Sequence, residues 1–375
     1  MKVLIVVPAF PLQLEAIKGG VNSALSNLLK GFSSIPIKVR VVSFNREIDK
    51  PVVVRYADNI TIHYMPESKL PHVINFIGRG AAMIRELIKE FNPSTVHFAM
   101  SGYILLTRLQ GLAGKKQVVT IHGIPFAEAK TKINLKEKLV FYSNGLVELM
   151  FCPKNIIHIS SYSAAQYSDK NTTTTIIANA IDPAYFKIPF KTTTDNKLIY
   201  IGSIEARKNL LYILQALKIL VAKKIYFSLS VLGGFTDETY KKNVLEFIEN
   251  NDLHNSVTLH GWTSQHHLQA ILAQSDILVL ASHQETLPMV IAESMSAAKV
   301  VVCSAVGGVP EMISHQNDGF LFDNSSVNNL VIILEKLYNN NVLVESIQIA
   351  ARRKAALIYH SDIVAKKTLS FYQSL

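Results

Sequence analysis

Two carboxylates, Glu285 and Glu293, lie eight residues apart in the segment SHQETLPMVIAESMSA, which covers residues 282–297. The segment follows the apolar run DILVL, and Pro288 suits the first turn of a helix. We therefore expect Glu285 in the loop after a strand and Glu293 about one and a half turns into the helix. An ionised carboxylate can accept hydrogen bonds from two adjacent sugar hydroxyls. The pair is therefore typical of a site that holds the hydroxyl groups of a nucleotide sugar.

The surroundings of this pair leave simpler interpretations open. Glu285 could be an acidic residue at a helix N-terminus, and Glu293 could be a solvated helix residue. The helix is otherwise apolar, so a buried Glu293 would need a partner. The backbone N–H groups near Leu287 and Met289 could bind phosphate oxygens at the start of the helix.

A second motif, YIGSIEARKNLLYIL, follows an apolar strand and opens a helix. Gly202 permits a sharp turn, and Arg207 and Lys208 are expected at the start of the helix. A helix N-terminus already attracts anions, so two cations there leave an excess of positive charge unless an anion binds. We expect a diphosphate, and a surface Arg-Lys pair is the alternative. Because G-x-G-x-x-G is missing, the motif is not a dinucleotide fingerprint.

Two features of the first half could also contact a ligand. Gly19 and Gly20 lie between the first apolar run and a helical segment. Paired glycines allow the backbone to approach a phosphate or sugar closely, and a flexible loop is the alternative. His122 lies at the carboxyl end of the predicted strand in VVTIHGIP, where it could be structural or could face a ligand.

The elements that must position these residues alternate along the chain. The predicted strands are KVLIVV, IKVRVVSF, TVHFA, QVVTIHG, NIIHIS and TTIIAN, followed by KLIYIGS, YFSLSVLGG, SVTLHGW, DILVLASH and KVVVCSAVGG. Continuous apolar strands that alternate with helices predict parallel sheets covered on both faces. The segment ANAIDPAYFKIPFKTTTDNK interrupts the pattern and is interpreted as a linker. We therefore predict an α/β protein of two doubly wound domains joined near residue 190, with the ligand in a cleft between them.

Composition agrees with a globular protein of this class. Of 375 residues, 49% are hydrophobic and 18% are charged, and a chain this long normally forms two domains. Two cysteines cannot form a disulfide framework and favour a reducing, cytoplasmic setting. No apolar stretch approaches the roughly 20 residues of a spanning helix, and MKVLIVVPAF is interpreted as a buried strand rather than a signal peptide. We expect a soluble protein, or one bound to a membrane only at its surface.

The positive charge is concentrated in the first half. Residues 1–190 hold 22 Lys and Arg against 12 Asp and Glu, whereas residues 191–375 hold 16 of each. An anionic membrane or an anionic lipid-linked substrate fits this distribution, and a basic solvated surface is the alternative. No aromatic-basic interleaving supports nucleic-acid binding, which we do not expect. KTKINLKEKLVFY, residues 130–142, could lie on a membrane surface or form a solvated amphipathic helix.

Taken together, these motifs resemble glycosyltransferase family four, whose members are retaining nucleotide-sugar glycosyltransferases with the GT-B fold of two facing Rossmann-like domains. The resemblance covers nearly the whole chain and is strongest over residues 197–321. There, YIGSIEARKN resembles the phosphate loop, and Glu285 and Glu293 form the E-x7-E motif ahead of NDGFLF. In the first half, the glycine pair, TIHG, ISSYSA and NAIDPAYF follow in the family's order.

The resemblance implies a role for each candidate residue. Arg207 and Lys208 would hold the donor diphosphate and stabilise the leaving nucleotide. Glu293 would hold the ribose hydroxyls, and Glu285 and His122 would lie at the donor sugar. The other substrate-binding positions that we predict are Gly19, Gly20, Gly202, Trp262, Thr263, Leu287, Pro288 and Met289. Because the cations would meet the charge of the diphosphate and no Asp-x-Asp motif is present, no divalent metal or other cofactor is expected.

The family's organisation implies an acceptor-side domain at 1–185, a donor-binding domain at 186–357, and a last helix at 358–375 that crosses back to the first domain. Some positions depart from the family's pattern. Ser203 replaces a frequent arginine, Thr286 and Pro288 replace glycines, and Ala298 and Val300 replace a Gly and a Pro. None of these changes removes a charged group to which we assign a role, but they leave the donor sugar open.

We therefore predict an enzyme that moves a hexose-type sugar from a UDP- or GDP-sugar to a glycan or lipid-linked acceptor, with the retention that the resemblance implies. Surface polysaccharide or lipopolysaccharide assembly is the expected setting, in the cytoplasm or on the inner face of the cell membrane. A nucleotide-sugar epimerase or hydrolase on the same fold is one alternative. A non-catalytic partner subunit is another. The missing glycine fingerprint disfavours a nicotinamide-dependent dehydrogenase.

Overall fold

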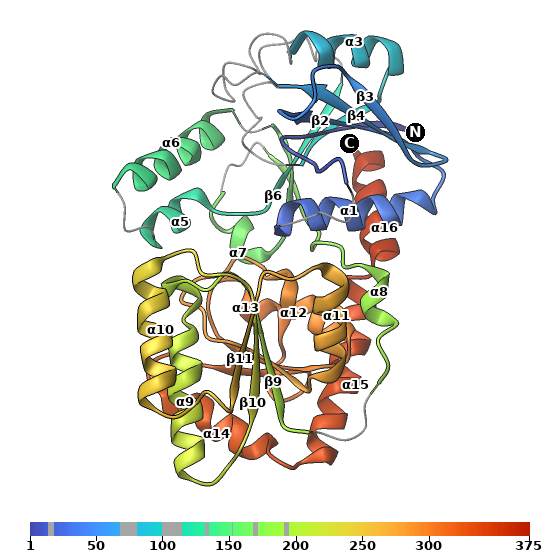
Figure 1. The fold of residues 1–375 in the computed structure, drawn as a ribbon. Coiled ribbons are helices and arrows are strands. Elements are labelled where there is room, and N and C mark those ends of the chain that lie inside the picture. The colour runs from blue at the N-terminus through green and yellow to red at the C-terminus, as the bar shows by residue number, and fades with distance from the viewer. Residues whose placement is uncertain are drawn as a thin grey trace. The chain divides into compact units, whose positions relative to one another are not determined.

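The computed structural model describes residues 1–13, 19–67, 81–99, 115–131, 135–151, 153–167, 172–190 and 195–375. The chain folds into two compact units, each built on one sheet (Figure 1). The first unit contains Met1–Ala180 together with Ser361–Leu375, and the second contains Ile181–His360. Within the part of the chain that the structure describes, no helix combines the length and apolar character that a membrane span requires.

The first unit has an eight-stranded sheet with the order β3-β4-β2-β1-β5-β6-β7-β8. All neighbouring strands are parallel except the edge pair β3 and β4. The strands are β1 Lys2–Val7, β2 Lys38–Asn45, β3 Val52–Ala57, β4 Ile60–Pro66, β5 Thr95–Phe98, β6 Lys116–Ile121, β7 Asn155–His158 and β8 Thr173–Ile176. The helices are α1 Gly20–Ser33, α3 Ala81–Phe91, α5 Pro125–Thr131, α6 Leu135–Phe151, α7 Ser161–Ala164 and α16 Ser361–Ser374.

The continuous apolar run of β1 explains the layering of this unit. Successive side chains of a strand point to opposite faces of its sheet. Val3 and Ile5 accordingly join the core cluster on one face, and Leu4 and Val6 join the cluster on the other. Both faces of the sheet are therefore covered, as the uninterrupted apolar strands predict.

The last helix, α16, packs on α1 within the first unit (Figure 1). Gly31 of α1 makes this close approach possible, because a Cβ there would lie 2.2 Å from the backbone oxygen of Ser361. Farther along α16, the buried hydroxyl of Tyr372 hydrogen-bonds to Nδ1 of His97 at 2.6 Å. The end of the chain thus stabilises the sheet that the start of the chain forms.

The second unit has a six-stranded, wholly parallel sheet with the order β11-β10-β9-β12-β13-β14. Its strands are β9 Lys197–Ile201, β10 Ser228–Leu232, β11 Val257–Gly261, β12 Ile277–Leu280, β13 Val300–Ser304 and β14 Phe320–Phe322. Its helices are α8 Pro183–Phe186, α9 Leu210–Ala222, α10 Glu238–Asn250, α11 Gln265–Gln274, α12 Met289–Ser296, α13 Val309–Met312, α14 Val327–Leu337 and α15 Asn341–Ile358. These sheets and helices confirm the predicted α/β class.

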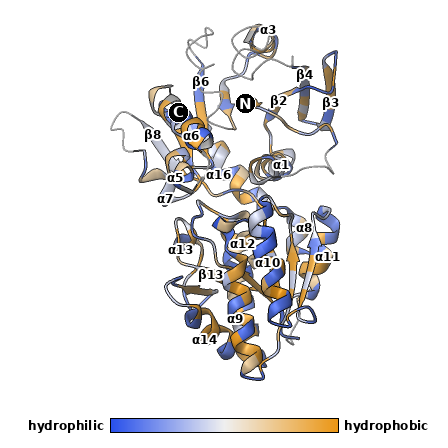
Figure 2. Cartoon of the chain, turned by 60° about the vertical axis from the view of Figure 1, so that its left-hand side comes forward, coloured by the Kyte–Doolittle hydropathy of each residue, from blue (hydrophilic) through white to orange (hydrophobic). Residues whose placement is uncertain are grey.

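The order of the second sheet reverses between β9 and β12, which are neighbours although β10 and β11 separate them in sequence. Loops that leave adjacent strands in opposite directions make a crevice at such a point, where α/β sheets bind ligands. The strongly hydrophobic helix α9, orange in Figure 2, buries most of its residues and anchors the loop that precedes it. The Arg-Lys motif follows β9, and the Glu285 loop follows β12.

Candidate functional site

The two loops at this switch point bring Lys208 and Glu285 into contact. Glu285 lies between β12 and α12 and is only 7% exposed. Nζ of Lys208 forms an ion pair with its Oε1, and the hydroxyl of Ser282 donates to the same oxygen at 2.7 Å. A buried carboxylate with a cation and a hydroxyl donor as partners is held in one orientation.

Arg207 joins the same cluster through a different set of contacts. Its Nη1 donates to the backbone oxygen of Gln284 at 3.0 Å and lies 3.9 Å from Oε2 of Glu285. Its Nη2 pairs with Oε1 of Glu205 at 2.8 Å. The planar guanidinium therefore spans both loops, a geometry that a lysine ammonium does not reproduce.

The local structure at Arg207 and Lys208 differs from the sequence prediction. They were expected at the start of a helix, but they lie on a separate 3₁₀ turn, Ala206–Lys208. Asn209 has a left-handed backbone with φ 54°, which ends this turn before α9 begins at Leu210. The prediction was wrong because a left-handed residue cannot continue a right-handed helix.

The prediction of an excess of positive charge at Arg207 and Lys208 is also wrong. Glu205 and Glu285 lie close enough to pair with the two cations, so the cluster is balanced without an added anion. The sequence argument considered only the helix terminus and overlooked the acidic residue two positions before Arg207. A bound diphosphate would therefore add to an existing ion-pair network rather than fill an empty positive pocket.

Glycines that were not predicted as part of the site allow its loops to pack closely. A Cβ on Gly307, which follows β13 and has φ +55°, would lie 1.7 Å from the backbone oxygen of Glu285. A Cβ on Gly233, which follows β10, would lie 1.8 Å from the backbone oxygen of Gly202. The glycine doublets in LGG and VGG, which follow these strands, could have indicated the close packing of the loops.

Glu293 has a hydrogen-bond partner of its own, on α8. It lies on the second turn of α12, as predicted, and its carboxylate accepts a hydrogen bond from Tyr185. Gln265 in turn donates to the Tyr185 hydroxyl at 2.9 Å. Burial raises the pKa of Glu293 to about 7, the charge of Asp182 adds to this, and the Tyr185 bond opposes it. Tyr185 and Gln265 were missed because they are remote from Glu293 in sequence.

The remaining predicted positions of the second unit lie at the ends of its elements. Trp262 follows β11, is 66% exposed and packs its indole against Gly234. Thr263 is partly exposed beside it. Pro288 is buried one residue before α12 begins, and Leu287 and Met289 flank it, partly exposed.

The glycine pair of the first unit lies at the start of α1. Gly19 precedes the helix with φ +84°, a conformation that explains the choice of glycine. Gly20 is the first residue of α1, and both glycines are exposed. The chain between Phe10 and Gly19 lies partly outside the described residues.

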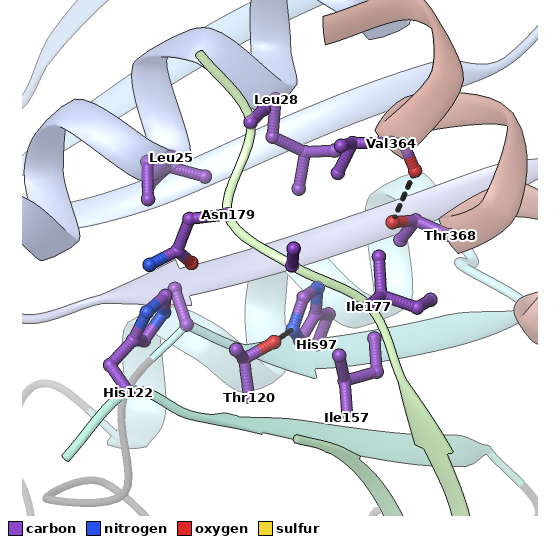
Figure 3. A pocket seen from close by; sticks show the side chains of 14 residues that line it. Leu25, Leu28, His97, Thr120, His122, Ile157, Ile177, Asn179, Val364 and Thr368 are labelled. Carbon is purple, nitrogen blue, oxygen red and sulfur yellow. Dashed lines mark hydrogen bonds between the residues drawn. The ribbon is translucent and has the colours of Figure 1, made fainter. Parts of the chain in front are cut away.

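His122 follows β6 and lines a largely apolar cavity in the first unit, together with His97, Thr120 and Asn179 (Figure 3). Burial lowers the pKa of His122 to about 4, and its hydrogen bonds to the Ala99 backbone and to Asn179 offset this only in part. Burial likewise lowers the pKa of His97 to about 3. Both rings are therefore neutral at pH 7 and can take part in hydrogen bonds without adding charge.

Among the residues that the structure describes, no group of three or more His, Cys, Asp or Glu side chains is placed to hold a metal ion. The absence of a metal from the working enzyme stays a prediction.

The candidate residues thus belong to both units. Gly19, Gly20 and His122 lie in the first, and the charged cluster and Glu293 lie in the second. Two family profiles match these two parts of the chain. Residues 18–185 match "Glycosyltransferase Family 4", and residues 182–354 match "Glycosyl transferases group 1".

Individual relatives have low sequence identity to this chain, but their alignments cover most of it. The amylovoran biosynthesis glycosyltransferase AmsK of Erwinia amylovora is 24% identical and aligns over 75% of this chain and 69% of its own. A UDP-Gal:α-D-GlcNAc-diphosphoundecaprenol α-1,3-galactosyltransferase of Escherichia coli is 23% identical over 85% of this chain and 87% of its own.

Solved structures match the fold along the whole chain. Sucrose-phosphate synthase from Thermosynechococcus elongatus superposes with a TM-score of 0.81 at 14% identity, over 100% of this chain and 98% of its own. Anabaena HepE in complex with UDP-glucose superposes with a TM-score of 0.75 at 16% identity, over 100% of both chains. The fold is the GT-B fold of two Rossmann-like sheets.

Proposed function

This chain belongs to glycosyltransferase family 4 and uses a nucleotide sugar, and we propose that it transfers a hexose-type sugar from a UDP-sugar to a glycan or lipid-linked acceptor with retention. The ion-pair cluster of Arg207, Lys208 and Glu285 at the switch point of the second sheet supports this proposal most directly. The Escherichia coli relative is named as an enzyme with a UDP-sugar donor and a lipid-linked acceptor. Surface polysaccharide or lipopolysaccharide assembly is the setting that we propose.

The cations would act on the leaving group. Cleavage of the sugar–phosphate bond places negative charge on the departing nucleoside diphosphate, and cations already aimed at that position lower the barrier. An ammonium has three N–H donors, so Lys208 can keep Glu285 and still bind a phosphate oxygen. Arg207 is fixed by Gln284 and Glu205, so little reorganisation would be needed when the donor binds.

The two glutamates would hold hydroxyl groups at the two ends of the donor. Glu285, oriented by Lys208 and Ser282, would accept from the transferred sugar. Glu293, oriented by Tyr185, would accept from the ribose. His122 would contribute a neutral hydrogen-bonding ring near the sugar, because its pKa is lowered to about 4. No divalent metal or cofactor is included in this proposal.

A thermal-shift panel tests the donor assignment. The full-length protein would be melted with UDP, GDP, ADP and CMP and with sugar conjugates of each, with and without EDTA. A ligand at a hundred times its dissociation constant adds about 2.7 kcal/mol to the free energy of unfolding. We expect UDP and one UDP-sugar to raise the melting temperature, with no effect of EDTA. A shift with GDP alone would assign guanine instead of uracil as the base of the donor. No shift with any nucleotide would contradict the proposal.

Product analysis then separates transfer from the alternatives. Incubation with the UDP-sugar identified above should leave it unchanged until a lipid-linked glycan acceptor is added. Conversion of the donor without any acceptor would favour an epimerase or hydrolase. Binding without conversion over a range of acceptors would favour a non-catalytic partner subunit.

A further inference from the structure

Helix α6 exposes a row of large apolar side chains. Positions 135, 139, 142, 146 and 150 follow the spacing that places residues on one face of a helix. The apolar residues at these five positions, with their exposed fractions, are Leu135 70%, Leu139 60%, Tyr142 41%, Leu146 56% and Met150 64%. We call this set the α6 stripe.

A small residue and a carboxylate lie on another side of α6. Gly145 is buried against the ring of Phe126 on α5, where a Cβ would lie 2.7 Å from the ring. Glu148 is 1% exposed and accepts a hydrogen bond from the hydroxyl of Tyr167. A surface helix of a globular protein normally turns its leucines to the core and its carboxylates to water. The exposed row of leucines and the buried Glu148 together indicate that the α6 stripe meets something other than water.

The charge of the first unit indicates what kind of surface the α6 stripe contacts. The first unit holds 23 Lys and Arg against 12 Asp and Glu, whereas the second holds 15 against 16. Lys130 at the end of α5, Lys136 in the first turn of α6 and Lys154 just beyond its end are all exposed. A second copy of this chain would bring like charge against like charge, which disfavours self-association. An anionic lipid surface instead offers acyl chains to the leucines and phosphate groups to the lysines.

We propose that α6 docks the enzyme on an anionic membrane, with the α6 stripe among the lipid chains and the neighbouring lysines at the headgroups. Tyr142 suits this boundary, since its ring is apolar and its hydroxyl is polar. The proposal extends the sequence prediction for residues 130–142, of which 132–134, including Lys132 and Ile133, lie outside the described residues. It concerns where the enzyme works and is independent of the donor assignment.

Vesicle sedimentation tests the proposal without measuring activity. The full chain is mixed with vesicles of equal parts phosphatidylcholine and phosphatidylglycerol, and with vesicles of phosphatidylcholine alone, at low and at high salt. The test variant carries Leu139→Ser and Leu146→Ser. The matched control carries Leu245→Ser and Leu357→Ser, two leucines of the second unit that are 42% and 65% exposed. Size-exclusion chromatography with light scattering reports the oligomeric state of each protein.

We expect the wild type and the control to bind the anionic vesicles, less at high salt. The test variant should bind at least about tenfold more weakly, since two large apolar side chains no longer enter the lipid. Wild-type protein that stays in the supernatant with both vesicles would overturn the proposal. So would equal binding of the test variant and the control. Loss of a dimer in the test variant, with vesicle binding unchanged, would assign the α6 stripe to a second copy instead.

Discussion

The charged cluster of the second unit and the buried histidines of the first unit hold their ionisable groups in different ways. In the second, Arg207 and Lys208 both lie within ion-pair distance of Glu285. In the first, burial keeps His97 and His122 neutral, with pKa values lowered to about 3 and about 4. One unit therefore concentrates fixed charge, which suits a diphosphate, and the other offers hydrogen bonds and apolar walls. Substitutions in the charged cluster should change catalysis, and a substitution that breaks the buried hydrogen bond between Tyr372 and His97 should change mainly stability.

The largest effect is expected from Lys208→Ala. Loss of the ammonium removes the donor that we propose for the leaving phosphate and should lower kcat by on the order of 10²–10³-fold. The melting temperature should change little, because Ser282 and Arg207 still contact Glu285. Steady-state kinetics and thermal melting measure both effects.

Lys241→Ala is the matched control, because Lys241 pairs with the highly exposed Glu238 at 3.1 Å and lies outside the site. It should keep normal turnover. Normal turnover in Lys208→Ala itself would remove the charged cluster from the mechanism and end the contrast between the units.

Glu293→Gln should weaken UDP binding by roughly 10- to 100-fold near neutral pH, since a charged acceptor is replaced by a neutral one. Its pKa of about 7 lies above the ordinary value of 4.5, so UDP affinity of the wild type should rise as pH passes through 7. The sign for folding is the reverse. Stability contributed by protonated Glu293 is fully present below pH 4.5 and is lost as pH rises through 7. Calorimetry and melting over this pH range measure both trends.

Two further variants sharpen this test. Tyr185→Phe removes the bond that lowers the pKa of Glu293, so the midpoint of the affinity profile should move to higher pH. Glu246→Gln, at an exposed glutamate of α10, should leave the profile unchanged. A wild-type profile that is flat between pH 5 and 8 would refute the role of Glu293.

Arg207→Lys should lower kcat/KM by about tenfold, since hydrogen bonds that involve a charged group contribute about 1.5–3 kcal/mol. A lysine keeps the charge but cannot bind both the Gln284 carbonyl and Glu205 with a planar fork. Arg55→Lys, at a surface ion pair with Asp58, is the matched control and should leave kcat/KM unchanged. Unchanged kinetics in Arg207→Lys would mean that only charge matters at this position.

The smallest effect on catalysis is expected from Tyr372→Phe. The change leaves Nδ1 of His97 without its partner and should lower the free energy of unfolding by about 1–3 kcal/mol. Turnover should stay normal. Tyr226→Phe, at a tyrosine that is 58% exposed, is the control for chemical denaturation. A loss of turnover in Tyr372→Phe would show that the first unit supports chemistry as directly as the second.

Local pattern was enough for much of this description. Uninterrupted apolar strands predicted parallel sheets, because a strand buried on both faces has no polar side. The eight-residue spacing placed Glu285 in a loop and Glu293 inside α12, and the structure has them there. Local pattern failed at Asn209, whose left-handed backbone separates the Arg-Lys turn from α9.

The sequence by itself determined the fold class, the order of the elements and the motif positions, because these depend on neighbours within a few residues. Only the tertiary structure decided which side chains contact each other at the site. Lys208 meets Glu285 across 77 positions, and Gln265 meets Tyr185 across 80. The tertiary structure also decided which face of α6 is exposed. A periodic pattern defines two faces of a helix, but it does not say which of them the core covers.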